Sequence, residues 1–415
     1  MTLAWAAYRL IAPCLGAMAP AAGVFTSPHE RPLWRERLGE VDLPEGCHAW
    51  VHAASLGEAA AVPPLLRELE RRQPGARFWL SATSRTGRDR LKRIGPPASL
   101  APIDSPQATR RFFAGVRPRR VFLIETELWP HWLLHARRAG IPVAVVSARL
   151  TERSVGRYRR LGPELRTLVG GLEAVLCQSR DDVRRWLAMG SRPERTMSVG
   201  NLKSDGLPRP AADRGEERVA LGLDSERPLL VLGSLRPGEA RLLARAWRRL
   251  PEATRERWQV VAVPRHPRAS DELRAEATTC GVIVTDEASL AGAWHWDART
   301  GVLVSWYRAA DVAFVGGSLT PWGGHNPLEP AACGAAVVMG PHHATQLEYV
   351  RALEARAAIW VAAEGQPLEV ALGALLGQDR VREQRALAAL EVAEALRGSA
   401  ARAVDRLVEF GLWPA

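Results

Sequence analysis

The sequence predicts two doubly wound α/β domains in tandem, and three observations support this prediction. Short apolar runs alternate with helical stretches from about residue 45 onward, as in parallel sheets covered by helices on both faces. The alternation pauses at GNLKSDGLPRPAADRG, which is rich in Gly, Pro and charge, and then resumes. A chain of 415 residues is also long for a single hydrophobic core.

The expected elements follow from this alternation. Strands are expected at Cys47–Val51, Arg77–Ser81, Leu100–Ile103, Val121–Glu125, Val143–Val146, Ala174–Gln178, Leu229–Gly233, Val260–Val263, Val312–Val315 and Ala336–Met339. Helices are expected at Ala59–Arg72, Thr86–Ile94, Pro106–Val116, Pro130–Gly140, Asp181–Gly190, Gly238–Leu250, Ser270–Cys280, Val302–Ala309, Leu328–Cys333 and Val381–Phe410. The expected domain bounds are 1–28 for an apolar N-terminal segment, 29–200, a linker at 201–215, 216–395, and a C-terminal helix at 396–415 that could pack back on the first domain.

The charge of the chain indicates anionic partners. Its net charge is +11, and of its 56 Lys and Arg residues only Lys92 and Lys203 are lysines. The other 54 are arginines spread along the whole chain, without an aromatic-rich basic element, so no nucleic-acid partner is expected. Lys203, in a polar loop, is a candidate functional residue because a compact ammonium differs from a guanidinium.

Cofactor and compartment signals are few. Five cysteines without paired spacing fit neither a disulfide framework nor a zinc site, so a reducing compartment is expected. No GxGxxG follows a strand, so a dinucleotide cofactor is not indicated, and no Walker sequence is present. Met1–Phe25 carries one charge, Arg9, and predicts a membrane-associated segment, with an amphipathic helix or a cleaved signal as alternatives. Arg31–Glu40 is basic and suits an anionic membrane surface or an ordinary surface helix.

Carboxylates stand where two strands end. Glu58 follows the strand and tight turn of WVHAASLGE, at the start of a helix, so it is either a helix-start carboxylate or an acid/base group. Glu125 and Glu127 follow the strand VFLI. Glu127 is interpreted as a helix cap, whereas capping and function are equally open for Glu125.

Two stretches of the second half are typical of anion sites. Arg265, in PRHPR after the strand VVAV, can hold a phosphate by paired hydrogen bonds, although an ordinary surface loop is the alternative. Phe314–Gly334 contains two glycine pairs, and Pro327 is expected to open a helix whose free amides bind an anion. Glu329 in that first turn can accept hydrogen bonds from a ribose.

Together these stretches resemble the bacterial 3-deoxy-D-manno-octulosonic acid (Kdo) transferase family. The resemblance runs from about Arg31 to the C-terminal region and rests on HAASLGE, IETELWP, ARLTERSVGRY, GNLKSD, VPRHP, DVAFVGGSL and GGHNPLEP, in the order of the family. It implies a GT-B architecture, two Rossmann-like domains facing across a cleft, with an N-terminal membrane anchor. It also implies an inverting transfer of Kdo from CMP-Kdo to the lipid A precursor (lipid IVA) on the cytoplasmic face of the inner membrane.

The resemblance also implies roles for individual residues. Glu58 matches the proton acceptor, and Glu125 and Lys203 match the positions credited with transition-state stabilisation. The positions that match CMP contacts are Pro264, Arg265, Thr300, Gly301, Val302, Asn326, Pro327, Leu328 and Glu329. No metal or other cofactor is implied.

The chain departs from the family pattern in three places. The MGEL turn becomes TGVL at Thr300–Leu303, so Val302 replaces an acid. A Ser-Thr pair becomes Ser234-Leu235, and GPHxxNF becomes GPHHATQ at Gly340–Gln346. These changes leave open a different nucleotide-activated sugar as donor, or a catalytically degenerate relative.

Overall fold

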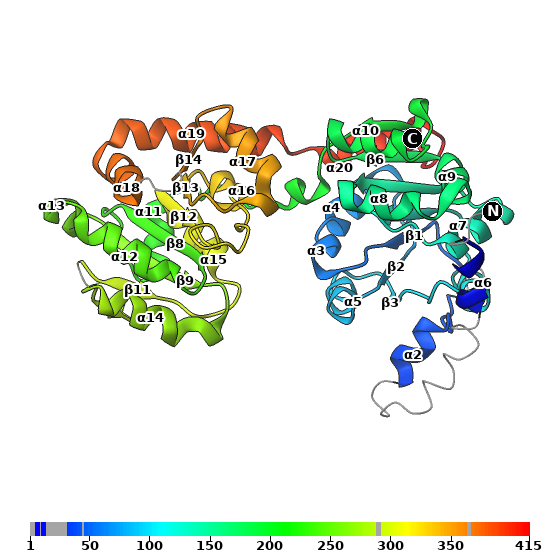
Figure 1. Ribbon diagram of the computed structural model, residues 1–415, viewed down its shortest axis with the longest axis horizontal. Helices are drawn as coiled ribbons and strands as arrows, with labels where there is room; N and C mark the ends of the chain where they lie inside the picture. Colours follow the sequence, from blue (N-terminus) through cyan, green and yellow to red (C-terminus); the bar gives the residue numbers. More distant parts are fainter. Residues whose placement is uncertain (1–4, 9, 14–30, 44, 288–291, 363–366) are drawn as a thin grey trace. The chain divides into compact units, whose positions relative to one another are not determined.

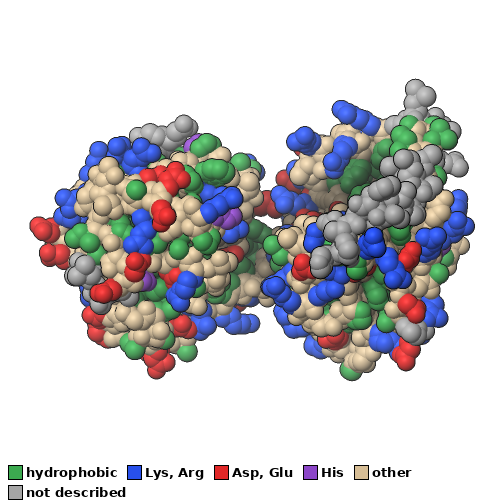
Figure 2. Space-filling model, turned by 90° about the horizontal axis from the view of Figure 1, so that it is seen from below, with side chains coloured by type: hydrophobic (Ala, Val, Ile, Leu, Met, Phe, Trp, Pro, Cys, Tyr) green, Lys and Arg blue, Asp and Glu red, His purple; other side chains and the backbone are tan. Residues whose placement is uncertain are grey.

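The computed structural model describes residues 5–8, 10–13, 31–43, 45–287, 292–362 and 367–415. The chain forms two compact units, Met1–Gly206 with Leu396–Ala415, and Leu207–Ala395. Each unit is a parallel sheet with helices on both faces (Figure 1). On the face that Figure 2 presents, Lys and Arg side chains are spread over both units with Asp and Glu between them.

The sheet of the first unit has a switch point at its centre. Its strands are β1 (Ala49–His52), β2 (Phe78–Ala82), β3 (Ala98–Leu100), β4 (Val121–Ile124), β5 (Val143–Ala148), β6 (Ala174–Cys177) and β7 (Thr196–Ser198). They run parallel in the order β3-β2-β1-β4-β5-β6-β7. The strand order therefore reverses between β1 and β4, where open α/β sheets bind their ligands.

Helices bury apolar side chains on both faces of this sheet. They are α2 (Arg31–Arg37), α3 (Leu56–Ala59), α4 (Val62–Arg72), α5 (Arg85–Lys92), α6 (Pro106–Val116), α7 (Pro130–Arg138), α8 (Glu152–Arg159), α9 (Gly162–Gly170), α10 (Arg180–Ala188), the 3₁₀ turns η1 (Pro193–Arg195) and η2 (Leu202–Gly206), and α20 (Ser399–Glu409). On one face, the Trp50 ring packs 4.7 Å from Phe112 and 5.0 Å from Trp132, measured between centroids. On the other face, Leu65 of α4 and Leu407 of α20 are fully buried in one core.

The C-terminal helix α20 belongs to the first unit, although it follows the second in sequence (Figure 1). Gly398, the N-cap of this helix, has a left-handed φ of 77° and so separates α20 from the preceding helical stretch. Asp205 of η2 then accepts hydrogen bonds from the first N–H groups of the helix, at Ser399 (3.1 Å) and Ala400 (2.5 Å). A carboxylate at a helix N-terminus is stabilised by both the free amides and the helix dipole.

The sheet of the second unit repeats this plan. Its strands are β8 (Leu229–Leu235), β9 (Gln259–Pro264), β10 (Val284–Thr285), β11 (Trp294–Trp296), β12 (Val312–Val315), β13 (Ala336–Met339) and β14 (Ile359–Val361). They run parallel in the order β10-β11-β9-β8-β12-β13-β14, with the switch point between β8 and β12. The helices are α11 (Arg214–Ala220), α12 (Glu239–Arg249), α13 (Glu252–Arg257), α14 (Ser270–Thr279), α15 (Leu303–Ala309), α16 (Leu328–Ala332), α17 (Leu347–Glu354), α18 (Leu368–Gly377) and α19 (Asp379–Ala395), with 3₁₀ turns η3 (Pro267–Ala269) and η4 (Ala344–Gln346).

The α/β class is as predicted, but several boundaries were wrong. The expected helix 59–72 is two helices, because Pro63 and Pro64 open a new one after α3. The expected helix 381–410 breaks at Gly398. The expected linker, 201–215, is not one segment, since η2 lies in the first unit and Arg214 begins α11.

The expected membrane-associated segment, 1–28, lies mostly outside the described residues. Residues 5–8 and 10–13 of it are helical. Within the described part of the chain, we find no helix with the length and apolar character needed to cross a bilayer.

Replacing Asp205 tests how α20 is fixed. We expect Asp205→Ala to lower the free energy of unfolding by about 1–2 kcal/mol, because the first amides of α20 lose their acceptor. Urea unfolding followed by circular dichroism measures this loss. Asp205→Asn keeps an acceptor oxygen and should lose less, whereas equal stability of all three proteins would contradict the capping role.

Candidate active site

The first group of candidate residues lies at the switch point of the first unit. Glu58 follows β1, whereas Glu125 and Glu127 follow its neighbour β4. We call these three side chains the carboxylate cluster. Parallel pairing of β1 with β4 brings the three together at one sheet edge, where the charges of Glu125 and Glu127 act on Glu58.

Glu58 lies in the first turn of α3, the short helix that Ser55 caps, and is partly buried. Ser55 Oγ accepts the Glu58 N–H (3.3 Å) and donates to Glu58 Oε1 (3.0 Å), while the Ala54 N–H donates to Oε2 (2.9 Å). Burial raises the pKa of Glu58, and the charges of Glu125 and Glu127 raise it further, against the opposing effect of these hydrogen bonds. A carboxylate whose pKa is raised is a better proton acceptor, so these hydrogen bonds at the helix start do not exclude acid/base chemistry.

Glu125 and Lys203 form an ion pair. Lys203 Nζ donates to Glu125 Oε1 at 2.6 Å, and the side chains are 31% and 14% exposed, respectively. Glu125 has a left-handed φ of 61°, which is strained for a residue with a side chain. Its N–H donates to Val146 O (3.1 Å), so the strained residue is fixed on β5. The structure thus joins two residues that the sequence singled out separately.

A polar network positions the loop that carries Lys203. The Lys203 N–H donates to Asn201 Oδ1 (3.0 Å), and Asn201 Nδ2 donates to Gln178 Oε1 (3.2 Å). Gln178 Nε2 donates to Ser147 O (3.0 Å), and Ser147 Oγ accepts the Leu202 N–H (3.3 Å). Sequence reasoning missed Ser147, Gln178 and Asn201, and its only signal was that Asn201 shares the GNLKSD stretch with Lys203.

The interpretation of Glu127 as a helix cap was wrong. Its Oε2 accepts the Trp129 indole N–H (2.6 Å) and lies 3.3 Å from Nε2 of the buried His52. The first amides of α7 donate instead to Asp104 Oδ1, from His131 (3.0 Å) and Trp132 (3.3 Å). Glu127 therefore belongs to the carboxylate cluster and not to the helix start.

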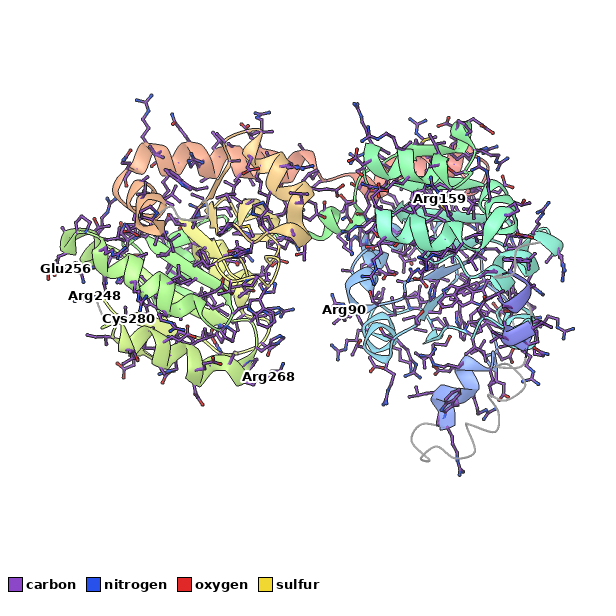
Figure 3. All side chains as sticks on the ribbon, viewed as in Figure 1. Arg90, Arg159, Arg248, Glu256, Arg268 and Cys280 are labelled. Carbon is purple, nitrogen blue, oxygen red and sulfur yellow. The ribbon has the colours of Figure 1, made fainter. Side chains whose placement is uncertain are left out.

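The second group of candidate residues lies at the switch point of the second unit. Pro264 ends β9, and the next residue, Arg265, donates its N–H to Leu235 O at 2.9 Å. Arg236 follows β8, so both arginines leave the sheet from adjacent strands. Arg268, labelled in Figure 3, lies in η3 just beyond them. Burial lowers the pKa of Arg236, and the charges of Arg265 and Arg268 lower it further.

A buried carboxylate shapes the glycine loop after β12. Glu239 is 0% exposed and accepts backbone N–H groups from Gly317 (2.7 Å), Ser318 (2.9 Å), Leu319 (2.9 Å) and Arg236 (2.8 Å). Gly316 is required there, because a Cβ would lie 2.4 Å from Ser234 O. Glu239 was missed from sequence, where it reads as an ordinary acid in the first turn of a helix.

The predicted nucleotide contacts from Asn326 to Glu329 lie at the start of α16 (Leu328–Ala332). Asn326 Oδ1 accepts the Leu328 N–H (3.0 Å), and Asn326 Nδ2 donates to Glu329 Oε1 (3.3 Å). Burial raises the pKa of Glu329, against the opposing effects of Asn326 and Arg265. Pro327 is the N-cap of α16 and not its first residue, so the helix begins at Leu328, and the Leu328 side chain is buried.

Two of the departures from the family pattern are apolar side chains, one partly buried and one in the core. Val302 caps α15 and packs against its hydrophobic cluster, whereas Thr300 and Gly301 are exposed. Leu235 is the last residue of β8 and is fully buried in the core of the second unit. Neither apolar side chain can hydrogen-bond a nucleotide, so any hydrogen bond there comes from the backbone. In the described ranges, no group of three or more His, Cys, Asp or Glu side chains could hold a metal ion.

Comparison with known proteins gives the family. Residues 33–206 match the family described as 3-deoxy-D-manno-octulosonic-acid transferase (kdotransferase). The 3-deoxy-D-manno-octulosonic acid transferases of Bordetella pertussis and Haemophilus influenzae are 34% and 30% identical, over 88% and 91% of this chain and 88% and 92% of theirs. UDP-GlcNAc 2-epimerase from Neisseria meningitidis shares the fold, with a TM-score of 0.61 at 13% identity over 87% of this chain and 99% of that one, and confirms the two-domain GT-B class. The chain therefore belongs to the 3-deoxy-D-manno-octulosonic acid transferase family.

Proposed function

We propose that the protein transfers Kdo from CMP-Kdo to a lipid A precursor, lipid IVA, with inversion at the anomeric carbon. The observation that carries the proposal is the carboxylate cluster beside Lys203, in which the pKa of Glu58 is raised. Membership of the family supports the sugar that is transferred. The resemblance of the motifs supports CMP-Kdo as donor and lipid IVA as acceptor.

In this mechanism Glu58 takes the proton from an acceptor hydroxyl while that oxygen attacks the anomeric carbon, C2, of Kdo. The new C2–O bond forms as the C2–O bond to phosphate breaks, and CMP leaves with the electron pair. Glu58 then releases its proton to solvent. The Lys203 ammonium, oriented by Glu125, offsets negative charge in the transition state, and Arg265 holds the CMP phosphate. Asn326 and Glu329 are assigned to the CMP ribose.

We place the reaction at the cytoplasmic face of the inner membrane. The apolar composition of 1–28 supports this location, as do the exposed Arg31 and Arg35 of α2, which suit an anionic lipid surface. The protein's other partners in this proposal are its two substrates.

Removal of the proposed base should stop transfer. We expect Glu58→Gln to lower kcat by about 10²–10⁴-fold, because an amide cannot accept the proton. Mass spectrometry of the lipid product measures the rate. CMP affinity and thermal stability serve as controls and should be retained, since Gln keeps one acceptor oxygen for the helix start. Wild-type transfer by this variant would remove Glu58 from the role.

The pH profile should report the charges around Glu58. Because the folded pKa of Glu58 lies above its usual value, kcat/KM should fall as pH drops through that raised pKa. Glu125→Gln removes a charge that raises this pKa and frees the Lys203 ammonium, so the acid limb should move to lower pH. An acid limb that does not move would show that Glu58 does not set the profile.

In the proposed chemistry, cationic side chains stabilise the negative charge of the leaving group, so the transfer rate should not depend on a divalent metal ion. We expect EDTA to leave the transfer rate unchanged, since Lys203 and Arg265 supply the positive charge. Steady-state assays with and without EDTA test this. A loss of activity that Mg²⁺ restores would contradict the assignment.

A further inference from the structure

We propose that Arg236 determines donor specificity by binding the carboxylate of the donor sugar, so that the site selects nucleotide-activated 2-keto-3-deoxy sugar acids over neutral sugars. The inference rests on the proposed function, in which the second unit holds a CMP-activated sugar. It adds a residue that no motif of the sequence indicated.

Arg236 stands between the other two elements of the nucleotide site. Leu235 at the end of β8 is in register with Pro264 at the end of β9. Arg236 and Arg265 are therefore neighbours on the carboxyl edge of the sheet. On the other side of β8, β12 leads into Gly316 and Gly317. A group bound by Arg265 and the glycine loop would therefore lie next to Arg236.

The guanidinium of Arg236 is held in place before any ligand binds. It lies over the Trp322 ring, 4.8 Å from its centroid, and its Nε donates to His325 Nε2 at 3.3 Å. A guanidinium can only donate, so His325 accepts this bond in its neutral form. Burial, followed by the charges of Arg265 and Arg236, lowers the pKa of His325 to about 4, which keeps the ring neutral. A fixed guanidinium loses little entropy when it binds an anion.

The positive charge at this edge is only partly compensated. Within the described part of the chain, no carboxylate lies within ion-pair distance of Arg236, Arg265 or Arg268. Glu239 acts on the charge of Arg236, but its two oxygens already accept four backbone N–H groups. Arg236 therefore has its two terminal amino groups available for an anion.

The chemistry of the proposed donor supplies two anions. In CMP-Kdo, the phosphate oxygen and the C1 carboxylate are attached to the same carbon, C2. A cation beside the phosphate-binding Arg265 is therefore suitably placed for the carboxylate. Each guanidinium can bind one anion by two parallel hydrogen bonds. Neutral sugars linked to a nucleotide lack the second anion, so Arg236 would favour the acid sugar.

Binding of CMP and CMP-Kdo, measured by calorimetry on the full-length protein without acceptor, separates the two contacts. We expect Arg236→Gln to weaken CMP-Kdo binding about 10- to 100-fold, as for the loss of charged hydrogen bonds, while CMP binding changes little. Arg236→Lys keeps the positive charge but lacks the two parallel N–H donors of a guanidinium, so it should recover part of the lost affinity. The control Arg248→Gln removes one exposed charge at the far end of α12 (Figure 3), and both affinities should be retained.

The outcomes are distinct. An equal loss of CMP and CMP-Kdo binding in Arg236→Gln would mean that Arg236 contacts the nucleotide or supports the loop, and it would overturn the inference. Unchanged binding of both ligands would overturn it as well. If the wild-type protein bound neither ligand, the proposed function would fail first, and the inference would fall with it.

Discussion

Both candidate sites depend on the fully parallel pairing of the two sheets. Parallel strands end at the same edge, so residues that follow different strands meet there although they are far apart in sequence. In the first unit this brings Glu58, after β1, to Glu125, after β4, and the loop after β7 adds Lys203. In the second unit it brings Arg265 and Arg236 to the glycine loop. The chemistry of each group depends on strand order more than on any single loop.

Several carboxylates in this protein shape the backbone around a site. Glu239 holds the glycine loop through three backbone amides and accepts a fourth from Arg236. Asp205, two residues beyond Lys203 in the chain, accepts the first amides of α20. Glu58 accepts the Ala54 N–H and the Ser55 hydroxyl just before its own helix while it lies in the carboxylate cluster. A structural hydrogen bond and a chemical role are therefore compatible, since the bonds that fix the carboxylate also hold it against its acidic neighbours.

Local sequence patterns identified candidate residues that follow strands, and the resemblance to the family predicted the roles of these residues. Glu58, Glu125 and Arg265 could be singled out because each follows a buried apolar run. The Lys203–Glu125 pair could not be predicted from local patterns, since it joins residues 78 positions apart. Glu239 and Arg236 resembled ordinary charged residues of a helix start. Strands of two or three residues leave no periodic pattern, so β7, β10, β11 and β14 were missed, and β3 was expected two residues too late.

The most direct test of the account is the mass of the lipid formed by the purified protein from CMP-Kdo and lipid IVA. The account predicts a lipid heavier by Kdo, with CMP released in equal amount. Release of CMP with an unchanged lipid would show hydrolysis without transfer. That result would contradict the assignment of Glu58 as the base that activates the acceptor hydroxyl.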